Sequence, residues 1–343
     1  MPSPDAPPGA GTALAWFGGR LATGLLEVTD DPAALDTEGW WAVVATFEGR
    51  LTCARFADVR PAPLPTAAWQ GPPRGAWRSS IDRAGYLAAV ERVRRDIAAG
   101  EVYQVNVCRV LSAPWPAGCD AVGLAGLLAS GNPAPYAGVV RLPAYDVHVV
   151  TASPELFLRR SGDVVESGPI KGTGATAADL RPKDHAENVM IVDLVRNDLG
   201  AVAEVGSVEV PLLCHVEEHP GLVHLVSTVR ARLRAGAAWP ELLAAAFPPG
   251  SVSGAPKSSA LRIIGEIEPV PRGPYCGAVG WVDADRQEAC LAVGIRTFWR
   301  HLDRLCFGTG AGITWASDPE TEWDETELKA ARLLAVAAGR SGT

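Results

Sequence analysis

The segment DRAGYLAAVERVRRDIAAGEVYQVNVCRVL, residues 82–111, contains the two local patterns that decide the fold class of this chain. In its first part apolar residues recur at helical spacing, Asp82 precedes them as an expected N-cap, and Gly100 follows as a stop signal. The second part alternates apolar and polar residues as a half-buried strand does, which puts Gln104 and Asn106 on one face. A helix followed at once by a strand indicates a mixed α and β fold.

The same two patterns alternate along the rest of the chain. This mixture predicts an α+β or layered α/β fold with largely antiparallel sheets. Strand-like runs occupy residues 136–151, 155–166, 275–283, 289–299 and 304–309, and expected helices occupy residues 120–129, 183–199, 239–246, 256–267 and 319–338.

The N-terminal part differs in character from the rest. Residues 1–12 are expected to form a disordered tail, and short apolar runs separated by turns predict antiparallel strands over residues 13–59. Residues 60–77 are rich in proline and therefore read as a connector. We accordingly divide the chain into the tail, a strand-rich region with its linker over residues 13–77, and a main region over residues 78–343.

Composition and charge narrow the class of protein. The 343 residues are 48% hydrophobic and 20% charged, which is typical of a globular protein with a large core. The net charge of −8, with no block of lysine and arginine, argues against a nucleic-acid partner. No apolar run reaches the roughly 18 residues of a membrane span, and the N-terminus does not resemble a signal peptide. Seven scattered cysteines without a CxxC pair favour reduced thiols, so we expect a cytoplasmic protein without structural zinc.

One lysine stands inside the glycine-rich stretch SGPIKGTGAT, residues 167–176. Lys171 could anchor a phosphate, could be a solvated turn lysine, or could act as a nucleophile. The phosphate-loop pattern is absent: GSVSGAPKSS comes closest, but Pro256 precedes Lys257 and the glycine spacing is wrong. GTGAGI, residues 308–313, lacks the spacing of a dinucleotide site. Nucleotide binding is therefore disfavoured.

Acidic side chains form two pairs at helical spacing. Asp184 and Glu187 share one face of an expected helix, and Glu322, Glu325 and Lys329 share one face of another. Each group has an ordinary structural explanation as a helix cap, a favourable first turn or an i,i+4 ion pair. Together they could instead bind Mg²⁺, which usually takes one or two protein carboxylates and completes its shell with substrate and water.

Two further residues stand in apolar surroundings. His224 lies in an apolar strand or helix, where a buried histidine of the core is the default interpretation. Arg296 stands in an expected apolar strand, and a guanidinium there is costly unless it meets an anion. Arg296 therefore indicates an anion-binding site.

Together these segments resemble the chorismate-utilising enzymes, and among them the large components of aminodeoxychorismate synthases. One such motif would be a weak signal, but ten motifs in the family's order, from about residue 81 to residue 335, are a specific one. The resemblance implies two stacked, largely antiparallel sheets flanked by helices. The motifs are YQVNV, SPELF, GPIKGT, DHAENVMIVDLVRNDLG, HLVSTV, FPPGSVSGAPKSSAL, RGPYCGAVGW, AVGIRT, GTGAGI and SDPETEWDETELKA.

The resemblance also implies a metal site and a general acid. The substrate would be chorismate, a dicarboxylate with an enolpyruvyl ether and a C4 hydroxyl. Glu187 and Glu325 would ligate Mg²⁺, supported by Asp184 and Glu322. Glu155, in SPELF, would protonate the departing C4 hydroxyl. Its pKa must rise from about 4.3 for this role, so we expect Glu155 to be partly desolvated.

Binding of the two substrate carboxylates is likewise implied by the resemblance. Arg296 and Tyr275 would bind the enolpyruvyl carboxylate. The backbone amides of GTGAGI would hold the ring carboxylate, because glycines allow the backbone to come close. The substrate-binding residues implied in this way are Gln104, Thr173, His224, Lys257, Tyr275, Arg296, Gly310, Ala311, Gly312 and Lys329.

Lys171 distinguishes the reactions within the family. Relatives that make anthranilate have a small residue at this position, and those that make isochorismate or salicylate have a lysine where this chain has Gln104. Lys171 would attack C2 of chorismate as the C4 hydroxyl leaves, and ammonia would then add at C4 and expel the lysine. An ordinary lysine is neutral in only about one molecule in 2,500 at pH 7, so this role requires a lowered pKa.

The implied product is 4-amino-4-deoxychorismate. Because the sequence contains no cysteine in a glutaminase motif, the implied partner is a separate glutaminase subunit that supplies ammonia. Anthranilate synthase component I and a non-catalytic chorismate-binding subunit remain alternatives.

Overall fold

The computed structural model describes residues 12–174, 176–219 and 222–339. The opening helix and strand are confirmed, since α1 (Arg83–Ala98) is followed by β6 (Gln104–Pro114). The expected cap is also present, because the Asp82 carboxylate accepts a hydrogen bond from the Gly85 N–H at 2.8 Å.

Eighteen strands in the described part form one hydrogen-bonded network, and their pairings are antiparallel. The predicted class, a mixed fold with largely antiparallel sheets, is therefore confirmed. The first half of the network contains, in spatial order, β12 (Glu209–His219), β13 (Leu222–Arg232), β10 (Val164–Gly168), β9 (Leu156–Ser161), β16 (Glu288–Val293), β15 (Ala278–Asp283), β3 (Trp40–Ala45), β4 (Leu51–Pro61) and β2 (Arg20–Thr29), with β11 (Ile170–Gly174) also beside β13. The second half contains β1 (Leu14–Phe17), β7 (Tyr136–Leu142), β8 (Val147–Ser153), β17 (Thr297–His301), β18 (Arg304–Ile313) and β6, with β5 (Arg78–Ser79) and β14 (Gly254–Ala255) at its edge.

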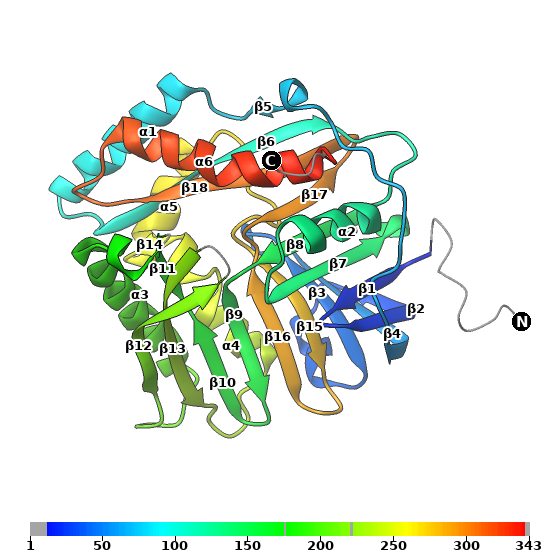
Figure 1. The fold of residues 1–343 in the computed structure, drawn as a ribbon. Coiled ribbons are helices and arrows are strands. Elements are labelled where there is room, and N and C mark those ends of the chain that lie inside the picture. The colour runs from blue at the N-terminus through cyan, green and yellow to red at the C-terminus, as the bar shows by residue number, and fades with distance from the viewer. Residues whose placement is uncertain (1–11, 175, 220–221, 340–343) are drawn as a thin grey trace, which may run out of the picture.

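The sheet folds back on itself at the hairpin of β1 and β2, so that its two halves form stacked layers (Figure 1). The main core joins the two layers: Val43 and Phe157 of the first half and Val140 and Trp299 of the second belong to one buried cluster. The two stacked sheets implied by the resemblance are thus parts of one continuous network.

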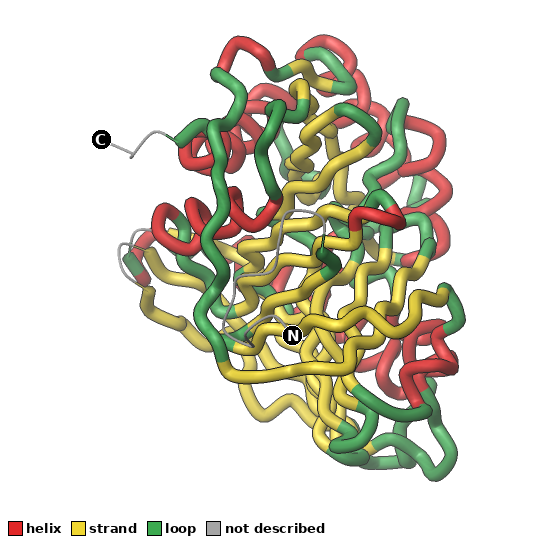
Figure 2. The backbone as a smooth tube through the Cα atoms, turned by 90° about the vertical axis from the view of Figure 1, so that its right-hand side faces the viewer, coloured by secondary structure: helices red, strands yellow, loops and turns green. Residues whose placement is uncertain are grey.

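Helices cover this sheet on both sides, and Figure 2 shows them flanking the strands. The helices over residues 121–131 and 319–337 pack on the second half of the sheet. A separate buried cluster, which includes Leu124, Leu333 and Phe307, joins them to it. No described helix has the length and apolar content needed to cross a membrane. Besides α1, the helices are α2 (Ala121–Gly131) and α6 (Pro319–Ala337) on the second half, α3 (Pro182–Gly200) and α4 (Trp239–Ala246) on the first, and α5 (Lys257–Ile267) beside β6.

Two of the predicted strand runs contain a reversal of the chain. Residues 136–151 cover most of the hairpin of β7 and β8, which turns at Asp146 with a φ of 52°. Residues 155–166 include the turn between β9 and β10 at Gly162, with a φ of 61°. The apolar pattern continues through such tight turns, so periodicity alone could not locate them. The hairpin of β12 and β13 was not predicted either.

The N-terminal strands pair with strands of the main region. β3 pairs with β15 from Trp40 to Ala45, and β1 pairs with β7. The proline-rich connector runs across the second half, where the Trp69 indole N–H donates to the Ala337 carbonyl at 2.7 Å. The proposed division at residue 77 stays a prediction, and the expected tail lies outside the described residues except for Thr12.

A buried ion pair fastens the loop after α5 to β6. Arg272 is 1% exposed and pairs with Glu268 at 2.6 Å, while it also donates to the carbonyls of Val252 and Asn106. Glu268 in turn accepts from the Cys108 N–H at 2.9 Å. Every charge in this cluster is therefore matched by a polar partner, which is the condition for burying it.

We expect Arg272→Met to lower the free energy of unfolding by about 3–5 kcal/mol, because it leaves the Glu268 carboxylate buried without its cation. Denaturant unfolding followed by circular dichroism measures this. Arg262→Met is the matched control: Arg262 pairs with Glu266 at the surface, and its loss should cost less than about 1 kcal/mol. Equal losses in the two variants would contradict the assignment.

Candidate active site

Two connections between the halves of the sheet carry predicted site residues. Glu155 lies where the chain passes from β8 to β9, and Arg296 lies where it passes from β16 to β17. Backbone hydrogen bonds hold these crossings side by side: the Val293 N–H donates to the Glu155 carbonyl at 3.0 Å, and the Ala152 N–H donates to the Arg296 carbonyl at 3.1 Å.

The prediction that Arg296 stands within an apolar strand is wrong. β16 ends at Val293 and β17 begins at Thr297, and Arg296 between them has a φ of 51°. This left-handed conformation is unusual for a residue with a side chain, and here it turns the chain from one layer to the other. Burial lowers the pKa of Arg296, and the neighbouring cation Arg332 lowers it further. No described acidic side chain pairs with Arg296, so its guanidinium is suited to an anion.

Glu155 is desolvated, as we expected. It is 4% exposed, and burial raises its pKa to about 7. Interactions with the Ser251 side chain, the charge of Lys171 and the Ile170 N–H act in the opposite direction and limit the rise. A carboxyl group with this pKa can exist in both protonation states near neutral pH, which suits an acid that later acts as a base.

Lys171 lies on β11, and its amine is directed into the protein. The residue as a whole is partly exposed, but its Nζ is enclosed and donates to the Ser251 carbonyl at 2.9 Å. Burial lowers the pKa of Lys171; the charges of Glu187 and Glu155 oppose this, and Lys329 adds to it. The pKa of Lys171 is therefore shifted in the direction that a nucleophilic lysine requires.

The two acidic pairs face this lysine from different helices. Burial raises the pKa of Glu187 on α3, Lys171 and Lys183 oppose the rise, and the carboxylate of Glu325 adds to it. Burial also acts to raise the pKa of Glu325 on α6, but Lys329, 2.6 Å away, lowers it overall. Residues of α3, α6 and β11 thus act on one another electrostatically at one place.

The outer members of the two pairs have structural partners. The Asp184 carboxylate accepts from the Arg181 N–H at 2.8 Å and so caps α3. Glu322 is 6% exposed, and burial raises its pKa while Ser317 opposes the rise. This agrees with the structural explanation that the sequence left open for Asp184.

The acids by themselves do not form a complete set of metal ligands. Within the described ranges no three His, Cys, Asp or Glu side chains gather closely enough to ligate one ion. The charge of Glu325 raises the pKa of Glu187, so the two carboxylates lie within electrostatic range of each other. Two carboxylates of this kind fit Mg²⁺, which completes its shell with water and substrate oxygens.

The glycines of GTGAGI lie within β18 and not in a loop. Lys329 Nζ donates to the Gly310 carbonyl at 3.1 Å, so Gly310 directs its polar groups away from β6. In an antiparallel strand this orientation repeats every second residue, so the Gly312 N–H also faces away and the Ala311 N–H faces β6. On the side of β18 opposite β6, β17 pairs with β18 only as far as Phe307. The Gly310 and Gly312 amides face this same side, beyond the end of the pairing with β17.

The absence of side chains on these glycines makes room for β6. A Cβ on Gly312 would lie 2.3 Å from the Gln104 side-chain nitrogen, and a Cβ on Gly310 would lie 2.6 Å from the Cys108 sulfur. Gln104 is 1% exposed and is therefore packed against this part of β18. Tyr275 is also buried, and its ring occupies the space that a Cβ on Gly308 would need.

Three predicted residues remain, and they are Lys257, His224 and Thr173. Lys257 pairs with Asp198 of α3 at 2.7 Å and donates to the Ala246 carbonyl. His224 is 4% exposed on β13, in register with Thr173 of β11. The side chain of Thr173 lies outside the described part of the structure.

Sequence reasoning missed Ser251. This residue of the 3-10 turn η5 (Gly250–Val252) is 7% exposed and interacts with both Lys171 and Glu155. Its contact with Lys171 is made by a backbone carbonyl, which every residue has. No side-chain pattern could therefore have revealed this contact, although Ser251 itself lies within the motif FPPGSVSGAPKSSAL.

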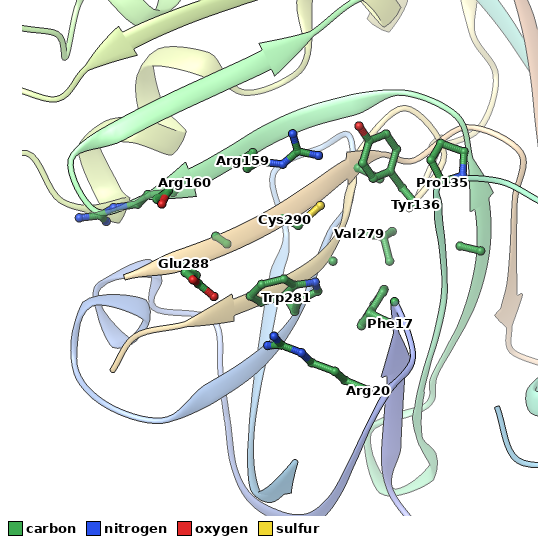
Figure 3. A pocket seen from close by; sticks show the side chains of 16 residues that line it. Phe17, Arg20, Pro135, Tyr136, Arg159, Arg160, Val279, Trp281, Glu288 and Cys290 are labelled. Carbon is green, nitrogen blue, oxygen red and sulfur yellow. The ribbon is translucent and has the colours of Figure 1, made fainter. Parts of the chain in front are cut away.

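A cavity of about 450 Å³ lies elsewhere, between β1, β7, β9, β15 and β16. Figure 3 shows Trp281, Tyr136, Arg20 and Arg159 around it. None of the residues predicted for the active site lines this cavity. The candidate site is thus defined by converging acidic and basic side chains and not by this cavity.

Comparison with known proteins identifies the family. A family model described as chorismate binding enzyme matches residues 41–335. The chain belongs to this family. Its members with similar sequences include anthranilate synthase component 1 from Haloarcula marismortui, 38% identical over 85% of this chain, and aminodeoxychorismate synthase component 1 from Klebsiella aerogenes, 38% identical over 76%.

These alignments cover 63% and 59% of the two relatives, so the chain spans less than two-thirds of their length. Among solved structures, anthranilate synthase component I from Streptococcus pneumoniae aligns over 97% of this chain and 93% of its own, with a TM-score of 0.75 and 22% identity. At this identity the likeness shows a shared fold.

The raised pKa of Glu155 predicts a pH-dependent stability. Because the folded state binds this proton more tightly than the unfolded chain, its stabilising effect is complete below about pH 4.5 and is lost as the pH rises to about 7. Relative to Glu155→Gln, the wild type should lose up to about 3 kcal/mol of unfolding free energy over this range. Denaturant titrations at several pH values measure it, and a pH-independent difference between the proteins would refute the assignment.

Proposed function

We propose that the protein is the large component of an aminodeoxychorismate synthase, which converts chorismate and ammonia to 4-amino-4-deoxychorismate and water. The observation that carries this proposal is the enclosed amine of Lys171, held at the Ser251 carbonyl and electrostatically coupled to both Glu155 and Glu187. A surface lysine would be protonated and solvated, and it could not act as a nucleophile.

Chorismate carries two carboxylates, and the site offers a separate partner for each. Arg296, without an acidic partner, would bind the enolpyruvyl carboxylate together with Tyr275. The amides of Gly310 and Gly312 and the Lys329 ammonium would hold the ring carboxylate. Glu187 and Glu325 would hold Mg²⁺, which when bound neutralises the ring carboxylate and favours departure of the C4 hydroxyl.

In the first half-reaction the neutral Lys171 amine attacks C2. The double bonds of the diene shift, the C4–O bond breaks, and protonated Glu155 gives its proton to the departing hydroxyl, which leaves as water. Burial supports both protonation states, since it favours the neutral amine and the neutral carboxylic acid.

In the second half-reaction ammonia adds at C4 and the double bonds shift back. The C2–N bond breaks and releases Lys171 as a neutral amine, while the Glu155 carboxylate takes a proton from the new C4 ammonium. Both residues thus return to their starting states, and the enolpyruvyl ether is retained. A separate glutaminase subunit would supply the ammonia, as the designation "component 1" of several relatives suggests.

Anthranilate synthase component I is the second candidate, because relatives with this name are as similar as those named aminodeoxychorismate synthase. In that reaction ammonia itself adds at C2, and an amine already occupying this position would obstruct it. Lys171 therefore favours aminodeoxychorismate. A non-catalytic chorismate-binding subunit would not need the desolvated acid Glu155.

The product identifies the reaction. With chorismate, Mg²⁺ and ammonium, we expect the purified chain to form aminodeoxychorismate by mass spectrometry, without free pyruvate. Lys171→Ala should lose any substrate-derived adduct and at least 100-fold in kcat, since ammonia cannot replace the tethered nucleophile. Lys183→Ala, which removes an exposed lysine near the same acids, should retain activity. Anthranilate and pyruvate as products would establish the second candidate instead.

The metal proposal predicts a binding defect that does not depend on turnover. Glu187→Gln should weaken Mg²⁺ binding at least tenfold in calorimetric titrations with chorismate present, because it removes one of two carboxylate ligands. Asp193→Asn alters an exposed acid of the same helix and should leave the affinity unchanged. Unaltered Mg²⁺ binding by the Glu187 variant would exclude this residue as a ligand.

A further inference from the structure

Ser251 is in contact with the two residues to which the proposed mechanism gives opposite roles. Its carbonyl oxygen accepts a hydrogen bond from Lys171 Nζ at 2.9 Å, and its side chain interacts with the carboxyl group of Glu155. It is 7% exposed, so both contacts lie largely away from solvent. Lys171 and Glu155 are both described, and no ion pair joins them directly.

A direct contact between the two would put them in the wrong states. At hydrogen-bonding distance the attraction between an ammonium and a carboxylate opposes the effect of burial and favours proton transfer from the acid to the amine. The ammonium has no lone pair for attack on C2, and the carboxylate has no proton for the C4 hydroxyl. A neutral residue between them therefore favours the protonation states that both functions need.

The groups that Ser251 presents suit this position. A carbonyl oxygen accepts an N–H from either an amine or an ammonium, so Lys171 keeps its place as its charge changes. When the amine is neutral, this bond uses one N–H and leaves the lone pair directed elsewhere. A hydroxyl donates to a carboxylate and accepts from a carboxylic acid, so Glu155 also has a partner in both states.

The segment around Ser251 is fixed from several sides. The Val252 carbonyl accepts from buried Arg272 at 2.9 Å, and the Ser253 carbonyl accepts from the Asn106 N–H at 2.8 Å. On the other side Gly250 packs so closely on α3 that an added Cβ would lie 2.5 Å from the Leu194 side chain. The carbonyl that holds Lys171 therefore belongs to a rigid part of the structure.

We propose that Ser251 is a positioning residue that separates Lys171 from Glu155 and aligns each for its step, an inference that rests on the proposed function. Lys171, from β11, is the charged side chain of the described residues that acts on Glu155; the other groups facing the carboxyl are the Ser251 side chain and the Ile170 N–H. Removal of the Ser251 hydroxyl therefore acts on Glu155 without altering a charge.

The test compares two variants that each lose one hydroxyl from the same segment. In Ser251→Ala we expect kcat to fall at least tenfold with little change in KM. The ionisation of Glu155 should move to higher pH by roughly 0.5–1 unit, because the carboxylate loses a donor. Ser253→Ala loses a hydroxyl that bonds only to nearby backbone carbonyls, and it should leave the ionisation unchanged. Ser251→Thr, which keeps the hydroxyl, should restore the wild-type pH profile.

Two readouts separate this inference from the proposed function. The pH dependence of turnover is measured with product analysis, and the Glu155 carboxyl is titrated by infrared difference spectroscopy in the free protein against Glu155→Gln. If the wild type forms aminodeoxychorismate but Ser251→Ala shifts neither profile, the inference is overturned and the function stands. If no aminodeoxychorismate forms, the function falls, and the infrared titration of folded Ser251→Ala still decides whether Ser251 acts on Glu155.

Discussion

The geometry of the site depends on two backbone hydrogen bonds between neighbouring crossings of the chain. One joins Val293 to Glu155 and the other joins Ala152 to Arg296, at 3.0 and 3.1 Å. Each crossing carries the chain between the stacked halves of one antiparallel sheet. One crossing carries the carboxyl group of Glu155, and the other carries the guanidinium of Arg296. A sheet that only paired its strands would direct these side chains alternately to core and solvent. The crossings break that alternation and give the acid and the guanidinium fixed positions.

Burial then sets the chemistry of the groups that converge there. It raises the pKa of Glu155 to about 7 and lowers the pKa of Lys171, so both neutral forms are favoured. The remaining acids come from α3 and α6, and cations accompany them: Lys329 pairs with Glu325, and Lys183 acts on Glu187. These acids are consequently balanced in part by cations, whereas Arg296 has no acidic partner among the described residues. Behind it, the Arg272 and Glu268 pair fastens β6 and η5, which carry Gln104 and Ser251.

Much of the fold and part of the site could be predicted from local sequence. The helices α1, α3 and α6 follow from their apolar spacing and first-turn residues, and Asp82 caps α1 as expected. The pairing of acids along α3 and α6 could likewise be predicted, because helical spacing alone puts Asp184 with Glu187 and Glu322 with Glu325 on common faces. Ordered motifs gave the family, which the match over residues 41–335 confirms.

The sequence by itself therefore determined the helices, the alternating strands, the family and the chemical types of the site residues, because these depend on neighbours a few positions apart. Only the tertiary structure decided that Arg296 leaves its strand in a left-handed conformation, that the Gly310 and Gly312 amides face away from β6, and that Ser251 lies between Lys171 and Glu155. These features depend on contacts between segments distant in the chain, such as the 80 positions between Lys171 and Ser251. They are made largely by backbone groups common to all residues, so no pattern of side chains records them.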